Sequence, residues 1–325
     1  MTAGPHENEP AAPAGSTAVL LMAYGTPRTR DEIEPYYTDI RRGRPPTPEQ
    51  LADLTARYDA LGGTSPLAAR TEAQRAALQQ ALDAAAPGGY HVALGLKHAE
   101  PKIEAAVDAL AAQGFRRIIG LVLAPHYSAY SVGQYLDRLR AAAEPHGITT
   151  AGVQSWATEP AFIEFVATDV RARLAAMPAN TKVVFTAHSL PQRIVATGDP
   201  YPDELRATAE AVAAAAGISG WTRWSIAWQS AGRTPEPWLG PDILQVIDDL
   251  AAAENDAASA QGLLVSAVGF VADHLEVLYD LDIEAARRAA GHGIAFARTA
   301  CVNDDPTVLA ALAQRVIAAD QGRTT

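Results

Sequence analysis

Short apolar runs alternate with longer amphipathic segments along nearly the whole chain. The apolar runs are rich in Val, Ile and Leu, which is typical of strands buried in a parallel sheet. They predict strands at 18–24, 91–97, 118–124, 149–155, 182–187, 222–229, 263–268 and 294–299. The amphipathic segments predict helices at 48–61, 67–85, 101–113, 132–143, 160–175, 203–216, 241–253, 273–290 and 306–319. Strands that alternate with helices form βαβ units, so the fold class is α/β with parallel sheets.

The predicted strands fall into two groups of four. With a chain of 325 residues, this grouping favours two doubly wound lobes over one closed barrel. We expect two Rossmann-like lobes at 17–150 and 151–305, each with a four-stranded parallel sheet flanked by helices. The helix at 306–319 is free to pack back on the first lobe. Residues 1–16 are rich in Pro, Ala and Gly and are expected to form a disordered lead.

Polar residues with possible chemistry follow several strands. Ligands of open α/β sheets bind beyond the carboxyl ends of the strands, and His98, His126, His188 and His274 all follow predicted strands. The stretch KVVFTAHSLPQR places His188 at the end of an apolar strand, just before a proline. This imidazole could be a core residue with a backbone partner, a catalytic base or a metal ligand, and the pattern leaves all three open.

Three carboxylates share one face of the predicted helix at 273–290. Glu276, Asp280 and Glu284 are spaced i, i+4 and i+8. One interpretation is a solvated polar face. The other is a ladder of carboxylates that leads a hard cation inward, with Glu276 innermost. Histidine and carboxylate ligands together suit a borderline ion such as Fe²⁺ or Zn²⁺.

Basic residues gather in the long connection at 25–46, in the stretch TDIRRGRPP. Arg41, Arg42 and Arg44 lie there, and Arg57 follows on the next helix. The net charge of −11 and the pI near 5.2 argue against a nucleic-acid partner. A local arginine cluster can still bind a small anion, although an ordinary basic loop gives the same pattern.

Several classes of protein are excluded or left without support. A single cysteine, Cys301, cannot form a disulfide framework, a four-cysteine zinc site or an all-cysteine iron–sulfur cluster. No G-x-G-x-x-G or Walker motif supports nucleotide binding. The chain has no apolar run of about 20 residues and no basic leader segment, so no membrane anchor and a cytoplasmic location are expected.

A series of motifs resembles one known family. MAYGTP (22–27), YYTDIRRGR (36–44), RYDALGGTSPL (57–67), GLKHAEP (95–101) and LAPHYSAYS (123–131) carry the resemblance. AHSLP (187–191), GDPYPDEL (198–205), WQSAGRTPEPWLGPD (228–242) and VGFVADHLEVLYDLDIE (268–284) continue it. They are similar, in order, to the ferrochelatases, and closest to the water-soluble coproporphyrin ferrochelatases of Gram-positive bacteria. The resemblance implies a chelatase-like fold with a porphyrin between two lobes.

The resemblance also implies roles for particular residues. It identifies His188 and Glu276 as the catalytic metal-site pair, and Tyr24 as an axial ligand from the opposite face of the porphyrin. The residues that contact the porphyrin or its propionates would be Tyr24, Arg41, Arg57, Tyr58, Ser65 and Tyr135. An outer acidic site would be formed by Asp280 and Glu284. We expect His274 to matter less than Glu276, because positions i and i+2 of a helix face different ways.

The expected function is insertion of Fe²⁺ into coproporphyrin III, which gives Fe-coproporphyrin III in heme biosynthesis. The charged stretch at 29–46 lacks the apolar surface suited to insoluble protoporphyrin, and its arginines suit four propionates. Other activities stay open: insertion of iron into protoporphyrin IX, or of cobalt or nickel into a related tetrapyrrole. A heme- or solute-binding module without turnover also stays open.

Fe²⁺ is a substrate, and no permanent cofactor is expected. Many actinobacterial members hold a [2Fe–2S] cluster with several cysteines, which Cys301 alone cannot do. Transient contact with neighbouring heme-pathway enzymes is also expected.

Overall fold

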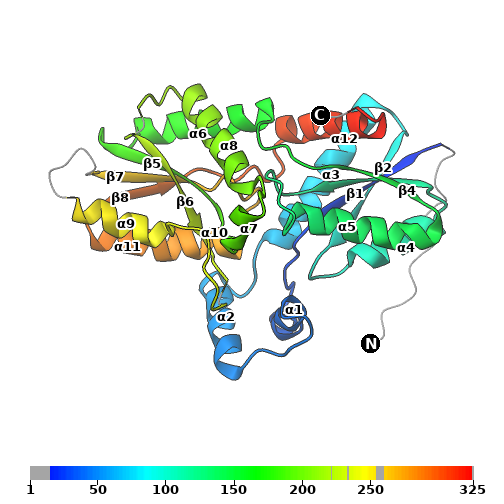
Figure 1. Cartoon of the computed structure of the whole chain (residues 1–325), viewed down its shortest axis with the longest axis horizontal. Helices are drawn as coiled ribbons and strands as arrows, with labels where there is room; N and C mark the ends of the chain where they lie inside the picture. The colour runs from blue at the N-terminus through cyan, green and yellow to red at the C-terminus, as the bar shows by residue number, and fades with distance from the viewer. Residues whose placement is uncertain (1–14, 221, 233, 254–259, 324–325) are drawn as a thin grey trace.

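The computed structural model describes residues 15–220, 222–232, 234–253 and 260–323. The expected disordered lead therefore lies outside the described residues, except for Gly15 and Ser16. All eight predicted strands are confirmed, with ends within two residues of those predicted. The strands form two parallel four-stranded sheets that lie side by side along the molecule (Figure 1). The α/β class and the two sheets are thus confirmed.

The first sheet is formed by β1 (Thr17–Ala23), β2 (Tyr90–Leu96), β3 (Arg117–Val122) and β4 (Thr149–Val153), in the order β2-β1-β3-β4. Strand residues alternate between its two faces. Leu20 and Met22 pack toward α4 (Ile103–Ala112) and α5 (Val132–Ala143). Val19 and Leu21 pack on the other face, toward α3 (Leu67–Ala85). Helices on both faces explain why the strands are continuous apolar runs.

The second sheet repeats this arrangement. It is formed by β5 (Thr181–His188), β6 (Trp224–Gln229), β7 (Gly262–Ser266) and β8 (Ala295–Arg298), in the order β6-β5-β7-β8. One face is covered by α6 (Pro160–Ala175) and α8 (Tyr201–Ala215), and the other by α9 (Ile243–Ala252) and α11 (Ala286–Gly291). Because the strand orders match, β1 and β5 hold equivalent positions. In each sheet the strand order reverses direction next to the strand in this position, at the β1/β3 pair in the first sheet and at the β5/β7 pair in the second. Doubly wound folds bind their ligands at such reversal points.

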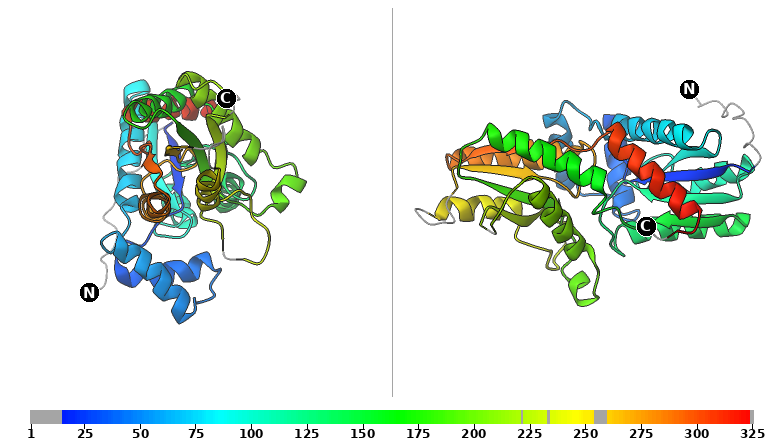
Figure 2. Two further views of the ribbon diagram at one scale, coloured as in Figure 1. Left: turned by 90° about the vertical axis from the view of Figure 1, so that its left-hand side faces the viewer. Right: turned by 90° about the horizontal axis from the view of Figure 1, so that it is seen from above.

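The last helix, α12 (Pro306–Asp320), joins the core of the first half of the chain (Figure 2). Leu309 and Leu312 belong to the same buried cluster as Leu78 and Leu82 of α3. At its end, Asp320 accepts hydrogen bonds from the Tyr90 hydroxyl at 3.0 Å and from the Arg117 guanidinium. The helix therefore returns from the second half and completes the helical layer over the first sheet.

Two helices lie outside the two layered units. The stretch expected as a long connection contains a 3₁₀ turn, η1 (Arg30–Glu32), and the helix α1 (Ile33–Ile40). A capping box between Thr47 and Gln50 begins α2 (Pro48–Ala60). Figure 1 shows α1 and α2 projecting below the junction of the two sheets. We call these two helices and the turn between them, residues 33–60, the lip.

The predicted continuous helix at 273–290 is wrong. The segment consists of α10 (Leu275–Leu278), a π-helix η3 (Asp280–Ala285) and α11. The Glu284 N–H donates to the Tyr279 carbonyl at 2.9 Å, five residues back instead of four. Single π turns inside helices often occur at functional sites. A short helix, α7 (Arg193–Ala196), was also not predicted. None of the helices in the described ranges is long and apolar enough to cross a membrane.

Candidate active site

His188 and Glu276 meet at the point where the second sheet reverses its winding. His188 is the last residue of β5, and Glu276 follows β7 in α10. Gly269 lets the loop after β7 pass against β5, since a Cβ there would lie 2.4 Å from the Ala187 Cβ. The imidazole Nε2 of His188 lies 3.7 Å from Oε1 of Glu276, and the side chains are 36% and 37% exposed. His188 is therefore open to a ligand and is not a core histidine.

The His188 ring is oriented by its backbone surroundings. Its Nδ1 lies 2.5 Å from the Ser189 carbonyl oxygen, which can only accept, so Nδ1 carries the hydrogen. The Tyr201 hydroxyl donates to the His188 carbonyl at 3.0 Å and fixes the end of the strand. The Nε2 atom consequently faces Glu276, where it can bind a cation or exchange a proton.

His274 approaches the other oxygen of the same carboxylate. Its Nε2 lies 3.6 Å from Glu276 Oε2, and its Nδ1 donates to the Ala272 carbonyl at 3.0 Å. The expectation that His274 and Glu276 face different ways is wrong. His274 caps α10 with extended backbone (φ −153°, ψ −179°), so helical spacing does not apply to it. The Phe270 ring packs against both imidazoles, with centroid distances of 6.4 Å to His188 and 5.0 Å to His274.

The two imidazoles keep Glu276 ionised. Desolvation raises the pKa of Glu276, but the nearby His188, His274 and Arg57 outweigh it and hold the pKa below its ordinary value. Two donors bound to one tetrahedral ion at about 2.1 Å lie roughly 3.4 Å apart, close to the 3.7 Å and 3.6 Å spacings here. Within the described ranges, no three His, Cys, Asp or Glu side chains are arranged to hold a metal ion.

Tyr24 holds the equivalent position in the first sheet, directly after β1. It is 43% exposed, which is unusual for a tyrosine in this molecule, and its ring lies 4.5 Å from the His98 ring. Desolvation, and secondly the charge of Glu276, raise the pKa of its phenol above the ordinary value. The negative charge on the second sheet therefore acts on a neutral phenol presented by the first.

The end of β2 contributes Lys97 and His98, of which the sequence had singled out His98 as a strand-end histidine. His98 Nδ1 lies 2.6 Å from Asp39 Oδ2 of α1, and burial lowers the pKa of His98 to about 4. The Lys97 ammonium lies 5.1 Å from the centroid of the Tyr135 ring, and burial, with Arg138 and Arg42, lowers its pKa to about 8. The position of Lys97 at the end of a strand was also visible in the sequence, but nothing there distinguished it from other polar residues.

The residues expected to contact the porphyrin come from the lip, from the start of α3 and from α5. Tyr58 is buried on α2, with its hydroxyl 3.3 Å from that of Thr26. Ser65 is buried, and its hydroxyl accepts from the Leu67 N–H at 3.2 Å, at the start of α3. Tyr135 is buried in α5 beneath Lys97. Arg41 lies over the Tyr37 ring at 5.7 Å, at the end of α1. Their contacts with a porphyrin stay predictions.

The outer carboxylates differ from one another. Asp280 is buried at 8% exposure, and burial, with the charges of Glu276 and Glu284, raises its pKa to about 6 against the effects of Ser230 and Arg57. Glu284 is exposed. Arg57 Nη1 lies 3.3 Å from Asp280 Oδ1, so an expected propionate ligand and an expected cation ligand contact each other. The three carboxylates of this segment therefore do not form a fully solvated polar face.

Of the four strand-end histidines, His126 has a different environment. It is 1% exposed, its Nε2 lies 2.9 Å from the Thr208 hydroxyl, and its Nδ1 has no partner. It is a core residue of the junction between the two halves.

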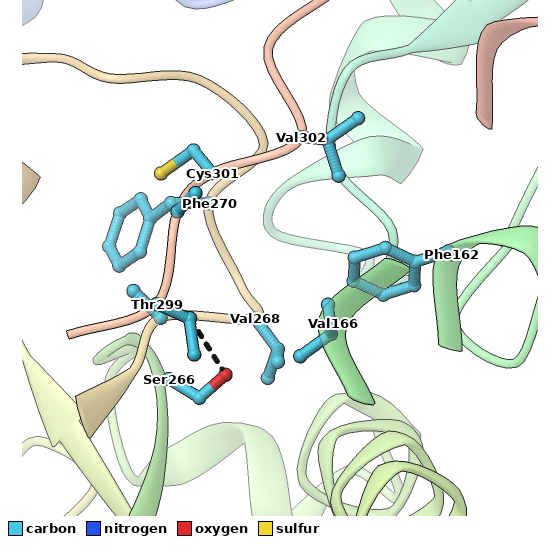
Figure 3. A pocket seen from close by; sticks show the side chains of 10 residues that line it. Phe162, Val166, Ser266, Val268, Phe270, Thr299, Cys301 and Val302 are labelled. Atoms are coloured by element: carbon cyan, nitrogen blue, oxygen red, sulfur yellow. Dashed lines mark hydrogen bonds between the residues drawn. The ribbon is translucent and has the colours of Figure 1, made fainter. Parts of the chain in front are cut away.

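A small pocket also lies beyond β7 and β8, lined by residues that include Phe162, Phe270, Thr299 and Cys301 (Figure 3). This pocket is far too small for a macrocycle.

Together, these features define a two-lobed α/β protein that presents an imidazole–carboxylate pair from one sheet and a phenol from the other. The structure resembles SirB from Bacillus subtilis, solved with Fe³⁺, with a TM-score of 0.56 at 12% identity over 94% of this chain and 98% of that one. At this identity the likeness shows the fold alone.

Sequence comparison is more specific. A ferrochelatase family model matches residues 16–320. Coproporphyrin III ferrochelatase of Geobacillus kaustophilus (strain HTA426) is 44% identical over 308 residues, 93% of this chain and 95% of the relative. Coproporphyrin III ferrochelatase 1 of Bacillus anthracis is 46% identical over 272 residues, covering 82% and 85%. The chain belongs to the ferrochelatase family.

Proposed function

We propose that this chain inserts Fe²⁺ into coproporphyrin III to give Fe-coproporphyrin III in heme biosynthesis. The observation that supports this most is the His188–Glu276 pair, with both donors partly exposed and 3.7 Å apart. The relatives named as coproporphyrin III ferrochelatases support the choice of substrate. Fe²⁺ is a substrate in this reaction and not a resident cofactor.

Insertion requires that two pyrrole N–H protons leave the ring while the cation enters it. His188 Nε2 is the acceptor on one face of the macrocycle, because its Nδ1 already donates to the Ser189 carbonyl. Glu276 stabilises the imidazolium that forms, offsets the charge of the incoming cation and relays the proton onward to solvent, so that His188 can accept the second pyrrole proton after the first. The Nε2 lone pair of His188 can bind the incoming cation first and accept a pyrrole proton once the cation has moved into the ring. The roles of metal ligand and proton acceptor therefore belong to the same atom.

Tyr24 has a different part. Its phenol is neutral, so it can approach the porphyrin from the face opposite His188 without adding charge. We propose that it becomes an axial ligand of the inserted iron. Arg41, Arg57, Tyr58, Ser65 and Tyr135 would hold the macrocycle and its propionates, while Asp280 and Glu284 would contact the cation on its way in.

The lip supports coproporphyrin III over protoporphyrin IX. Coproporphyrin III has four propionates, whereas protoporphyrin IX replaces two of them with vinyl groups. Arg41, Arg42 and Arg44 gather at the end of α1, and the Lys97 ammonium lies close enough to Arg42 for the two charges to interact. Such a cationic rim favours the porphyrin with more carboxylates by charge-assisted hydrogen bonds.

A direct assay tests the proposal. Purified protein is incubated anaerobically with Fe²⁺ and an excess of coproporphyrin III, and the Soret band is followed. Many equivalents of porphyrin should be converted per protein. Stoichiometric conversion or a simple spectral shift would instead identify a heme- or porphyrin-binding protein, and conversion only with Co²⁺ or Ni²⁺ would identify a different chelatase.

Three further expectations stay predictions. The absence of a [2Fe–2S] cluster rests on the single cysteine, whose thiol is free and buried. The cytoplasm as the place of reaction rests on the sequence. The third expectation is transient contact with neighbouring heme-pathway enzymes, which would pass on poorly soluble porphyrins.

A further inference from the structure

Both oxygens of Asp280 are engaged by the protein. Oδ1 faces Arg57 Nη1 at 3.3 Å, and Oδ2 accepts a hydrogen bond from the Ser230 hydroxyl at 2.5 Å. Ser230 itself has a positive φ of 59°, a conformation that non-glycine residues rarely adopt. In this arrangement Asp280 is closed to a cation, although it lies on the same segment as Glu276.

Arg57 is the attractive charge acting on Asp280. Glu276 and Glu284 repel its carboxylate, and Arg57 opposes that repulsion. The Asp280 side chain is 10% exposed, and an ionised carboxylate buried among like charges is unstable without a cation. If Arg57 moves away, another cation must take its place or the carboxylate must be protonated.

The contact with Arg57 is exchangeable. It is a single contact at 3.3 Å, longer than the 2.7–2.9 Å of strong charge-assisted hydrogen bonds. The guanidinium also lies 4.9 Å from the centroid of the Tyr279 ring and 3.6 Å from Asp53 Oδ2. Arg57 belongs to α2 of the lip, and its side chain is 29% exposed. A free carboxylate that reaches it can form a bidentate pair, which is stronger than the present contact.

We infer that Arg57 blocks Asp280 in the porphyrin-free protein, and that a porphyrin carboxylate draws Arg57 away so that a divalent cation replaces it. This inference rests on the proposed function. It makes the two substrates cooperative, because porphyrin binding opens the carboxylate that the cation needs. By thermodynamic linkage, the cation raises the affinity for porphyrin by the same factor.

Calorimetry of Co²⁺ binding tests the inference. Co²⁺ is titrated into the protein with and without Zn-coproporphyrin III, a tetracarboxylate whose ring is already occupied by a metal, so that no insertion can follow. In the unaltered protein, the porphyrin should tighten Co²⁺ binding by roughly 5- to 150-fold, the usual range of coupling. Arg57→Met keeps an apolar stem but removes the charge. This variant should bind Co²⁺ tightly without porphyrin and show no further gain.

Two other variants complete the experiment. Arg30→Met removes an exposed cation that pairs with Asp59 at the base of the lip, and it should keep the full coupling. Asp280→Asn should bind Co²⁺ with the same affinity with and without porphyrin, which tests the inference even if Arg57→Met does not fold. Equal Co²⁺ affinity with and without porphyrin in the unaltered protein would overturn it, as would full coupling in Arg57→Met.

The iron-insertion assay is run on the same preparations. No turnover by the unaltered protein contradicts the proposed function. Normal turnover without coupling contradicts only the role of Arg57, so the two failures can be told apart.

Discussion

The imidazole Nε2 of His274 lies 3.6 Å from Oε2 of Glu276, while His188 approaches Oε1 of the same carboxylate. Glu276 is therefore held between two imidazoles, each with its Nδ1 hydrogen directed to a backbone carbonyl. This arrangement makes His274 part of the site. Replacing His188, Glu276 or His274 should therefore slow iron insertion to different extents.

His274→Ala should lower kcat for iron insertion by about 10- to 100-fold, the usual effect of losing a partner that orients a metal-site ligand. The variant should still bind coproporphyrin III, because the change removes support for Glu276 and no lip residue. Steady-state kinetics and porphyrin fluorescence titration measure the two effects. A kcat equal to that of the unaltered protein would show that His274 only packs against Phe270.

His188→Ala should be more severe, with insertion slowed by about 10²- to 10⁴-fold, as expected for loss of a general base. Glu276→Gln should fall in the same range, because it keeps the shape of the side chain but removes its charge. Both variants should keep their fold and porphyrin affinity, measured by circular dichroism and fluorescence. Near-normal turnover in His188→Ala would contradict the assignment of the proton acceptor.

The sequence predicted the strands well and the details of the site less well. Strands covered on both faces must be apolar throughout, and this made β1 and β5 visible, with Tyr24 and His188 at their ends. The π-helix was not predictable, because one extra residue in a turn leaves the apolar pattern almost intact. His274 was misplaced because the predicted helix began two residues early. The contact between Arg57 and Asp280 joins residues 223 apart, which local patterns cannot reveal.

Tyr24→Phe should change the visible spectrum of the protein-bound iron coproporphyrin. Phenylalanine keeps the ring but removes the oxygen that would bind the inserted iron. Absorption and electron paramagnetic resonance spectra of the ferric product complex measure the change, and Tyr36→Phe, which alters a neighbouring ring 6.5 Å away, is the matched control. Identical spectra for Tyr24→Phe and the unaltered protein would show that Tyr24 is not a ligand.

Acidification should destabilise the fold through His126. Burial lowers the pKa of His126 to about 3, whereas an imidazole in the unfolded chain titrates near 6.5. Between these values the unfolded chain takes up a proton that the folded protein does not. The free energy of unfolding should therefore fall as pH drops below about 6.5, by at most ~1.4 kcal/mol per pH unit from this residue. Urea unfolding of the unaltered protein and His126→Gln at several pH values measures the contribution. Parallel pH profiles would contradict it.

Arg41 should contribute to the choice of porphyrin. It lies at the end of α1, where its Nε donates to the Arg44 carbonyl at 3.2 Å and holds the turn of the lip. A propionate that meets Arg41 at this exposed position should gain about 1 kcal/mol, roughly fivefold in kcat/KM. Arg41→Ala should therefore lower kcat/KM for coproporphyrin III by about that factor and leave the value for protoporphyrin IX nearly unchanged.

The comparison is made at fixed Fe²⁺ and at two ionic strengths, because salt screens exposed charges and should reduce the preference of the unaltered protein. Arg30→Ala, which removes a cation paired with Asp59, should keep the preference. If the unaltered protein uses both porphyrins equally well, the lip does not select by charge. If the preference survives in Arg41→Ala, Arg41 does not select the porphyrin, and the selection depends on other cations.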